Sequence, residues 1–319
     1  MTIDGRRYPV RFTEYVHSRV MKSNRDTFSF DKLEMKDVAN ACKVPCPQVY
    51  AEVDDPHSIQ ELPRVKLPLV IKPRDLAGAK GVLFLSAEKH GRYFEEFSQE
   101  WLTLEEIKEK ISQVIAAKRP TAKRCIVEQG IKGENAGIPF DYKLYTFQGC
   151  VEFVLQIDRN GSKPRLSFFG SNFTSLPEGL VYSHSNKSVF VSPTLPKNYK
   201  QMIDVAERVA THLGTAFCSV DLYTDGKRVM LGEITAGPGG PYVGRLFAFS
   251  PQYDIHLGAK WLDAISHLGL ERPVITGLPP VVVREQQNLL RKARCWSLDT
   301  AEKPSGLGGV HDDGLSNGD

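Results

Sequence analysis

The stretch from Phe217 to Gly244 limits the folds open to this chain more than any other part of the sequence. Apolar residues alternate on both sides of an Asp225-Gly226 turn pair, which predicts a β-hairpin followed by a glycine-rich loop. Two carboxylates, Asp221 and Glu233, lie inside these apolar strands, and burying a charge is costly unless another group pairs with it. Oxygen ligands that face each other across a hairpin suit a hard cation such as Mg²⁺.

The residues after Glu233 extend this predicted site. Thr235 is two residues further along the strand, so its hydroxyl points to the same face. The segment 236–240 offers backbone N–H groups that could wrap an anion. The alternative is that Asp221 and Glu233 are solvated strand positions followed by a flexible loop, because edge-facing carboxylates are common.

A second glycine-bearing loop lies much earlier in the chain. The apolar strand predicted over 67–73 carries Lys72, the loop 74–81 follows, and a strand resumes at 82–85. Such a flap can close over phosphates, with the loop N–H groups, Lys72 and Lys80 supplying positive potential. The pattern GxxxxGK[ST] is absent, so this is not a Walker A site. The alternative is a solvated hairpin turn.

A second hairpin is predicted from 140–147 and 151–158, joined by a Gln-Gly turn. Lys143 lies on the first strand, and Arg159 follows the second. Together they could meet a transferring phosphate or a substrate carboxylate. The alternative is that Lys143 simply pairs with Asp141, two positions away on the same face.

The rest of the chain shows mixed periodicities. Apolar spacing predicts helices over 12–22, 32–42, 92–118, 197–214 and 254–268, and a strand-to-helix segment over 281–294. Short strands are predicted over 49–53 and 125–128. The region 160–195 is rich in Asn, Ser, Gly and Pro, and we expect a loop-rich, substrate-facing insertion there. From about residue 299 onward the composition predicts a disordered tail.

The composition argues against several classes of protein. The net charge of +3 over 319 residues is too small for a dedicated nucleic-acid binder. No apolar run reaches membrane-spanning length, and the N-terminus has no apolar core of a secretory signal. The 6 cysteines are scattered and form no CxxC pair, so we expect reduced thiols in a cytoplasmic protein. The oligomeric state cannot be predicted from the sequence.

Taken in order, these segments resemble the ATP-grasp superfamily, and most closely its branch of proteins similar to the teichuronopeptide-biosynthesis protein TupA. The resemblance spans roughly residues 30–260. It implies an α+β fold in which two lobes clasp ATP, with a short helical N-terminal region. The segments that carry it are DKLEMKDVANACKVPCPQVY (31–50), LPLVIKP with its glycine loop (67–81), IVEQGIKG (126–133), FDYKLYTFQG (140–149), DRNG (158–161) and VDLYTDGKRVMLGEITAGPGG (220–240).

The resemblance also implies a domain order and a role for each matching residue. The expected regions are 1–60 (N-terminal region), 61–130 (small lobe with the flap), 131–298 (large lobe with the metal-binding hairpin) and 299–319 (tail). The nucleotide would be bound by Lys32 and Lys72 at its phosphates, by the flap residues Gly78, Lys80 and Gly81, by the adenine connector Glu128, Gln129 and Gly130, and by Glu134 at the ribose. Lys143 would lie near the γ-phosphate, and Mg²⁺ would be held by Asp221 and Glu233, with Thr235 at the position where many members have Asn. Arg159, named above from its place after the second strand of the hairpin, is the other expected catalytic residue.

Members of this superfamily use ATP and Mg²⁺ to activate a carboxylate as an acylphosphate, which an amine then attacks. The resemblance therefore implies a ligase acting on a small-molecule carboxylate and an amine. Thr235 stands where many members have Asn, and a hydroxyl can still ligate Mg²⁺. Two alternatives stay open: a phosphotransferase on the same fold, and a nucleotide-binding protein without ligase chemistry. ADP release that depends on an amine would separate the ligase from the phosphotransferase.

Overall fold

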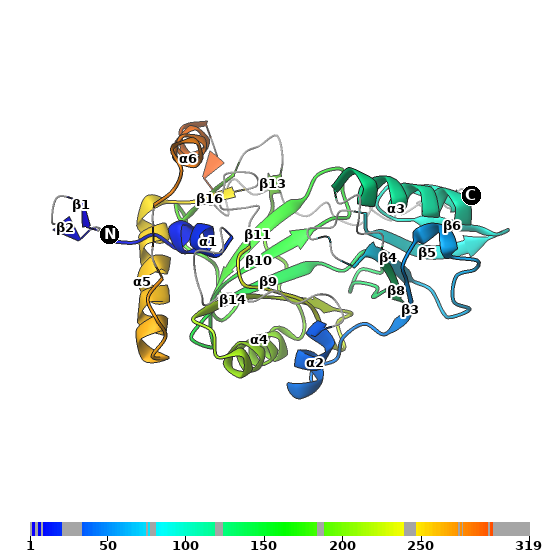
Figure 1. Cartoon of the computed structure of the whole chain (residues 1–319), viewed down its shortest axis with the longest axis horizontal. Coiled ribbons are helices and arrows are strands. Elements are labelled where there is room, and N and C mark those ends of the chain that lie inside the picture. The colour runs from blue at the N-terminus through cyan, green and yellow to red at the C-terminus, as the bar shows by residue number, and fades with distance from the viewer. Residues whose placement is uncertain are drawn as a thin grey trace, which may run out of the picture.

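The computed structural model consists mainly of two six-stranded sheets, each covered by helices (Figure 1). It describes residues 2–3, 6–7, 9–20, 34–74, 76, 81–118, 124–183, 188–238, 247–273, 275, 277–292 and 294–295. The predictions for Lys32, for most of the flap and for the tail 299–319 lie outside these residues.

One sheet, here called the small-lobe sheet, has the strand order β3-β8-β4-β5-β6-β7 and is antiparallel throughout. Its helix α3 buries Ile107, Ile111 and Ile115 against the sheet, in an apolar cluster with Leu69 and Leu85. This is the amphipathic pattern expected of a surface helix. The elements are β3 (Val49–Val53), η1 (Pro56–Ser58), β4 (Leu69–Pro73), β5 (Leu83–Lys89), β6 (Arg92–Glu95), β7 (Glu100–Thr103), α3 (Leu104–Lys118) and β8 (Cys125–Gln129).

The other sheet, the large-lobe sheet, has the order β13-β11-β10-β9-β14-β15, and β11 and β13 are its only parallel pair. Helices α4 and α2 lie on one face, and α1 and α5 on the other (Figure 1). The elements are α1 (Phe12–Val20), α2 (Glu34–Ala41), β9 (Asp141–Phe147), β10 (Cys150–Asp158), β11 (Arg165–Gly170), β13 (Val189–Phe190), α4 (Tyr199–Leu213), β14 (Phe217–Thr224), β15 (Val229–Thr235) and α5 (Pro251–His267).

The two faces of the large-lobe sheet differ because strand residues alternate. Tyr142 and Leu144 of β9 join the apolar cluster under α4, whereas Tyr145 and Phe147 join the cluster with α1 and α5. Lys143 has the same parity as Tyr145. We call the face that carries it the site face: its far end is covered by α1 and α5, and its near end carries charged side chains.

Smaller elements complete the fold. A three-stranded sheet has the order β16-β12-β17, and helix α6 contacts its strands β12 and β16. A short β1–β2 hairpin lies at the N-terminus, at the left of Figure 1. Their bounds are β1 (Thr2–Ile3), β2 (Arg6–Arg7), β12 (Val181–Ser183), β16 (Phe247–Phe249), α6 (Pro280–Lys292) and β17 (Arg294–Cys295).

One expectation from the sequence is wrong in the structure. The helix predicted over 92–118 begins only at Leu104, because 92–103 form the β6–β7 hairpin, in which Phe94 lies opposite Trp101. The buried carboxylate of Glu95 fixes this hairpin by accepting the N–H groups of Phe84 and Ser98 at 3.0 and 2.7 Å.

The region 160–195 is loop-rich as expected, but part of it belongs to the core of the large lobe. Its strand β11 pairs with β10 along its whole length and buries Leu166 and Phe168 in the core, because two apolar side chains of the same parity outweigh the flanking polar residues. The strands of both predicted hairpins and helices α4 and α5 are present where the sequence predicts them, within a few residues.

Candidate functional site

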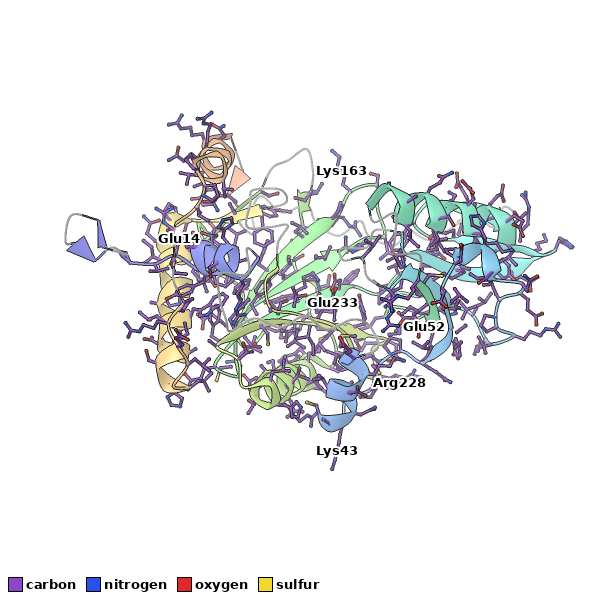
Figure 2. The ribbon with its side chains drawn as sticks, in the orientation of Figure 1. Glu14, Lys43, Glu52, Lys163, Arg228 and Glu233 are labelled. Carbon is purple, nitrogen blue, oxygen red and sulfur yellow. The ribbon has the colours of Figure 1, made fainter. Side chains whose placement is uncertain are left out.

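Three neighbouring strands bring the predicted metal ligands and the predicted catalytic lysine together. Asp221 on β14 lies opposite Glu233 on β15 and, on its other side, opposite Lys143 on β9. Thr235 lies opposite Ser219, one step further along the same face. Figure 2 shows Glu233 toward the end of the large-lobe sheet that is nearer to the small lobe. Lys143, Asp221, Glu233 and Thr235 therefore lie together on the site face.

Lys143 is the centre of a charged cluster. Its ammonium forms an ion pair with Asp221 Oδ2 and lies 3.2 Å from Asp141 Oδ2. Arg159 Nη2 lies 3.3 Å from the same oxygen of Asp141. The Lys143–Asp141 pair expected as an alternative is thus present, but together with the Lys143–Asp221 pair. Cations and carboxylates alternate through the cluster, which limits the cost of burying them.

The charges in this cluster are shielded from water. Asp221 is only 2% exposed, and its second oxygen accepts the Ser219 hydroxyl at 2.9 Å. Burial raises the pKa of Asp221, and the ammonium of Lys143 opposes that rise. Burial alone would lower the pKa of Lys143, but the carboxylates of Asp141 and Asp221 raise it well above its ordinary value. Lys143 therefore stays protonated at neutral pH.

The predicted residues of the small lobe pair with each other. Lys72 on β4 and Glu128 on β8 form a largely buried ion pair between adjacent strands. The N–H of Gln129 donates to Gln48 O at 2.8 Å, and that of Gly130 donates to Pro68 O at 2.9 Å. A side chain at Gly130 would collide with Pro68, so the connector requires glycine there. Lys72 and the connector are thus joined through the Glu128 ion pair and the strand β8.

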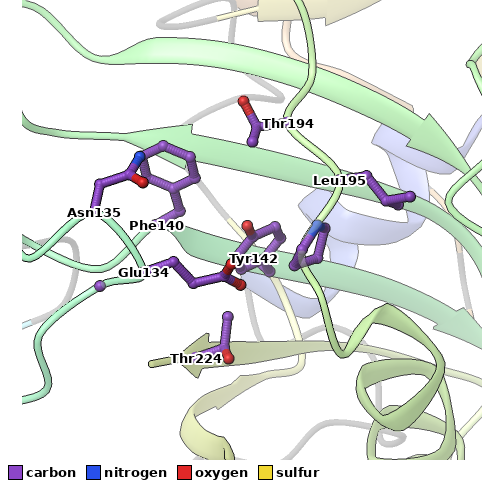
Figure 3. Close-up of a pocket in the computed structure, with 9 residues that line it drawn as sticks. Glu134, Asn135, Phe140, Tyr142, Thr194, Leu195 and Thr224 are labelled. Atoms are coloured by element: carbon purple, nitrogen blue, oxygen red, sulfur yellow. The ribbon is translucent and has the colours of Figure 1, made fainter. Parts of the chain in front are cut away.

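Glu134 lies apart from the charged cluster. It lines a cavity of about 50 Å³ together with Tyr142 and Thr224 (Figure 3). It also accepts the N–H of Lys197 at 3.3 Å. Tyr142 and Thr224 alternate with Lys143 and Tyr223 along their strands, so this cavity is on the face opposite the site face.

The remaining predicted residues are partly described. Gly81 has a φ of +70° and sits between Pro73 and Val114, which explains the glycine. Gly78 and Lys80 lie outside the described residues, as does Lys32.

Sequence reasoning missed three residues of the cluster. Asp141 was expected only as an alternative partner of Lys143, and neither Ser219 nor Tyr223 was singled out. The signal that could have found them is strand parity. Ser219 and Tyr223 flank Asp221 at two residues on either side, and Asp141 has the same relation to Lys143.

Comparison with known families agrees with this arrangement. The family profile described as TupA-like ATPgrasp matches residues 27–262. The chain belongs to the TupA-like ATP-grasp family. The match covers both sheets of this TupA-like protein, including all strands of the charged cluster.

Three solved structures similar to this TupA-like protein share little sequence with it. D-alanine–D-alanine ligase from Helicobacter pylori is 14% identical, with a TM-score of 0.41, over 73% of this chain and 57% of that one. The same enzyme from Bacillus anthracis, complexed with ATP, is 14% identical with a TM-score of 0.42, over 81% and 67%. The ATP-grasp ligase PsnB, complexed with minimal precursor, Mg and ADP, is 11% identical with a TM-score of 0.36, over 72% and 54%.

The chain therefore spans 57% of the length of the first of these structures. No curated protein sequence matches the chain. Within the described part of this TupA-like protein, none of the helices combines the length and apolar character needed to cross a bilayer.

Proposed function

We propose that this TupA-like ATP-grasp protein is an ATP-dependent ligase that converts a small-molecule carboxylate to an acylphosphate and joins it to an amine. The observation that carries the proposal is the row of Glu233, Asp221 and Lys143 on three neighbouring strands. It places two acidic oxygen donors beside a fixed ammonium, and phosphoryl transfer depends on such prearranged charge. Membership of the family supports the ATP-grasp part of the proposal.

The donor set fits Mg²⁺. Asp221, Glu233 and Thr235 offer oxygen atoms on adjacent strands, and Mg²⁺ is commonly held by one or two carboxylates together with substrate phosphates. Among the described residues, no set of three or more His, Cys, Asp or Glu could hold a metal without such phosphates. When bound, Mg²⁺ supplies positive charge that neutralises the phosphates of ATP.

The basic side chains have separate tasks in this proposal. Lys143, which stays protonated between Asp141 and Asp221, donates to an oxygen of the transferring phosphoryl group. Arg159, held by Asp141, binds the substrate carboxylate beside it. Lys72 is held by Glu128 and approaches the nucleotide from the small lobe. The transfer needs no nucleophilic side chain. The substrate carboxylate attacks the γ-phosphate and ADP leaves; the amine then attacks the acyl carbon, inorganic phosphate leaves, and the amine loses a proton to water.

A cytosolic location belongs to the same proposal. Cys42, Cys46, Cys125, Cys150 and Cys218 are free thiols, which is usual in reducing compartments.

The decisive experiment is a substrate screen with purified protein, ATP and Mg²⁺. It follows ADP release over panels of carboxylates and amines and identifies condensed products by mass spectrometry. ADP release that requires both a carboxylate and an amine supports the ligase. Release with a carboxylate or other acceptor alone, with a stable phosphorylated product, would overturn it in favour of a phosphotransferase.

A further inference from the structure

Leu231 and Glu233 point to opposite faces of the large-lobe sheet although they are two residues apart on β15. Leu231 is fully buried in the apolar cluster under α4 and lies opposite Leu222. Glu233 lies opposite Asp221, on the site face. Residues two apart in a regular strand share a face, so the alternation changes between these two positions.

The change comes from a β-bulge at Gly232. The pairing runs from Leu222–Leu231 directly to Asp221–Glu233, which leaves Gly232 as an extra residue without a partner on β14. Ile234 confirms the change, because it lies three residues from Leu231 and joins the same apolar cluster. If the same sequence formed a regular strand with Gly232 paired, Glu233 would share the face of Leu231 and point toward that cluster, since a shift of one residue moves a side chain to the other face.

The ring of Tyr223 occupies the space next to this bulge. A Cβ atom built on Gly232 would lie 2.9 Å from Tyr223 Cδ2, 3.0 Å from Cζ, and closer still to Cε2. Gly232 does not have a left-handed backbone conformation, so its φ would permit other residues. What excludes a side chain at 232 is therefore the ring that rests on its backbone.

Tyr223 also borders the charged cluster. Burial is the main cause that raises the pKa of its hydroxyl, and the charges of Asp141, Asp221 and Glu233 raise it further. Tyr223 is two residues after Asp221 on β14, so both side chains are on the site face, and the ring of Tyr223 rests on Gly232.

We propose that Gly232 and Tyr223 form a positioning pair that holds Glu233 on the site face, where it can bind a divalent cation. This inference rests on the proposed function. The bulge sets the direction of Glu233, and the ring fixes the bulge by packing on a glycine that nothing larger can replace. The pair explains two positions of the sequence together: Tyr223, two residues after Asp221, and Gly232, directly before Glu233.

The test is a double-mutant cycle on Gly232→Ala and Tyr223→Ala. Binding of Mn²⁺ in the presence of ATP is measured by electron paramagnetic resonance, which needs no turnover. Gly232→Ala should weaken Mn²⁺ binding by about 10-fold or more, the usual effect of losing a group that orients a metal ligand. In the Tyr223→Ala background the same substitution should change the affinity by less than about twofold, because the added methyl group then has space.

Two further variants act as controls. Tyr223→Phe keeps the ring and should keep the affinity for Mn²⁺. Gly161→Ala tests for a general effect of replacing a glycine, because a Cβ atom at Gly161 meets only an ordinary van der Waals contact. If Gly232→Ala is insoluble, recovery of both folding and Mn²⁺ binding in the double variant supports the pair.

The outcomes separate this inference from the proposed function. A wild-type protein that binds no Mn²⁺ with ATP overturns the proposed function and the positioning role with it. The positioning pair alone is overturned if the wild-type protein binds Mn²⁺ but Gly232→Ala has equal effects in both backgrounds. The same holds if Gly232→Ala has no effect in either background. Failure of the double variant to recover binding has the same meaning.

Discussion

Lys143 shows how one residue sets the character of the site. It lies between two carboxylates and is 20% exposed, so its ammonium is the counter-charge that allows Asp221 to be buried. A cation in this position also attracts the anionic substrates that the proposed reaction requires. The same side chain is therefore expected to contribute to stability and, in the proposed reaction, to turnover, and the two contributions can be measured separately.

Lys143→Met should destabilise the fold. Removing one partner of a buried pair leaves an uncompensated charge, which costs about 3–5 kcal/mol. The free energy of unfolding is measured with denaturant. Lys110→Met is the matched control, because the Lys110–Glu100 pair is exposed and pairs of that kind contribute less than about 1 kcal/mol. Equal losses in the two variants would contradict the role assigned to Lys143.

Glu233→Gln should leave the fold intact and remove turnover. Glu233 is partly exposed on the site face, so the isosteric amide changes charge without creating a cavity. Loss of a prearranged electrostatic group lowers kcat by about 100-fold or more. Glu152→Gln serves as control, because Glu152 pairs with His256 and Lys260 instead. Wild-type turnover in Glu233→Gln would place the metal elsewhere.

At the scale of elements, local signals predicted more than long-range ones. The 217–235 hairpin follows from alternation and one Asp-Gly turn, both readable within a few residues. The same alternation places Lys143 and Asp221 on one face, whereas Glu233 joins them only through the bulge at Gly232. The Lys72–Glu128 pair was not predicted, because it depends on β4 and β8 becoming neighbours although more than fifty residues separate them.

The other differences between the sequence-based predictions and the structure also have physical causes. The bulge at Gly232 leaves no mark on composition, since it is visible only once Leu231 is known to be buried. In 92–103, charged residues mimic one face of a helix, and the cross-strand contact of Phe94 with Trp101 outweighs that pattern. Arg19 was not predicted either, because its partners are distant in the sequence. Its guanidinium donates hydrogen bonds to Phe217 O and Ala236 O and so joins α1 to the ends of β14 and β15.

Helices α1 and α5 meet at a buried carboxylate that makes their packing sensitive to pH. Asp254 accepts the N–H of Thr13 at 2.9 Å and its hydroxyl at 2.7 Å. Burial raises the pKa of Asp254 to about 6, although the bonds from Thr13 lower it. The folded state thus binds this proton more tightly than the unfolded chain, so the contribution of Asp254 to stability is largest below pH 4 and falls as the pH rises through 6.

Asp254→Asn should therefore become relatively more stable as the pH rises. The difference in free energy of unfolding between variant and wild type should shift toward the variant by about 2 kcal/mol between pH 4 and pH 7, because each pKa unit corresponds to about 1.4 kcal/mol. Denaturant titrations at several pH values measure this difference. A difference that stays constant across the range would show that Asp254 does not titrate in this window.

At the scale of the whole molecule, the apolar cores are separate. The cluster of the small-lobe sheet shares no residue with the two clusters of the large-lobe sheet. Each sheet therefore has its own source of hydrophobic stability, and the two can open with different free energies. The predicted nucleotide contacts are divided in the same way, with Lys72 and Glu128 on one sheet and Lys143 and Asp221 on the other.

Mg-ATP should consequently stabilise both sheets at once. A ligand at about 100 times its dissociation constant adds roughly 2.7 kcal/mol to the state that binds it, and binding that needs both lobes protects both. Hydrogen exchange of β4 and β9 amides measures this protection for each sheet. ATP without Mg²⁺ should protect less, and Glu233→Gln should remove the increment due to Mg²⁺. Protection of β9 without β4 would contradict a nucleotide held between the lobes, because a ligand bound to one sheet alone leaves the opening of the other unchanged.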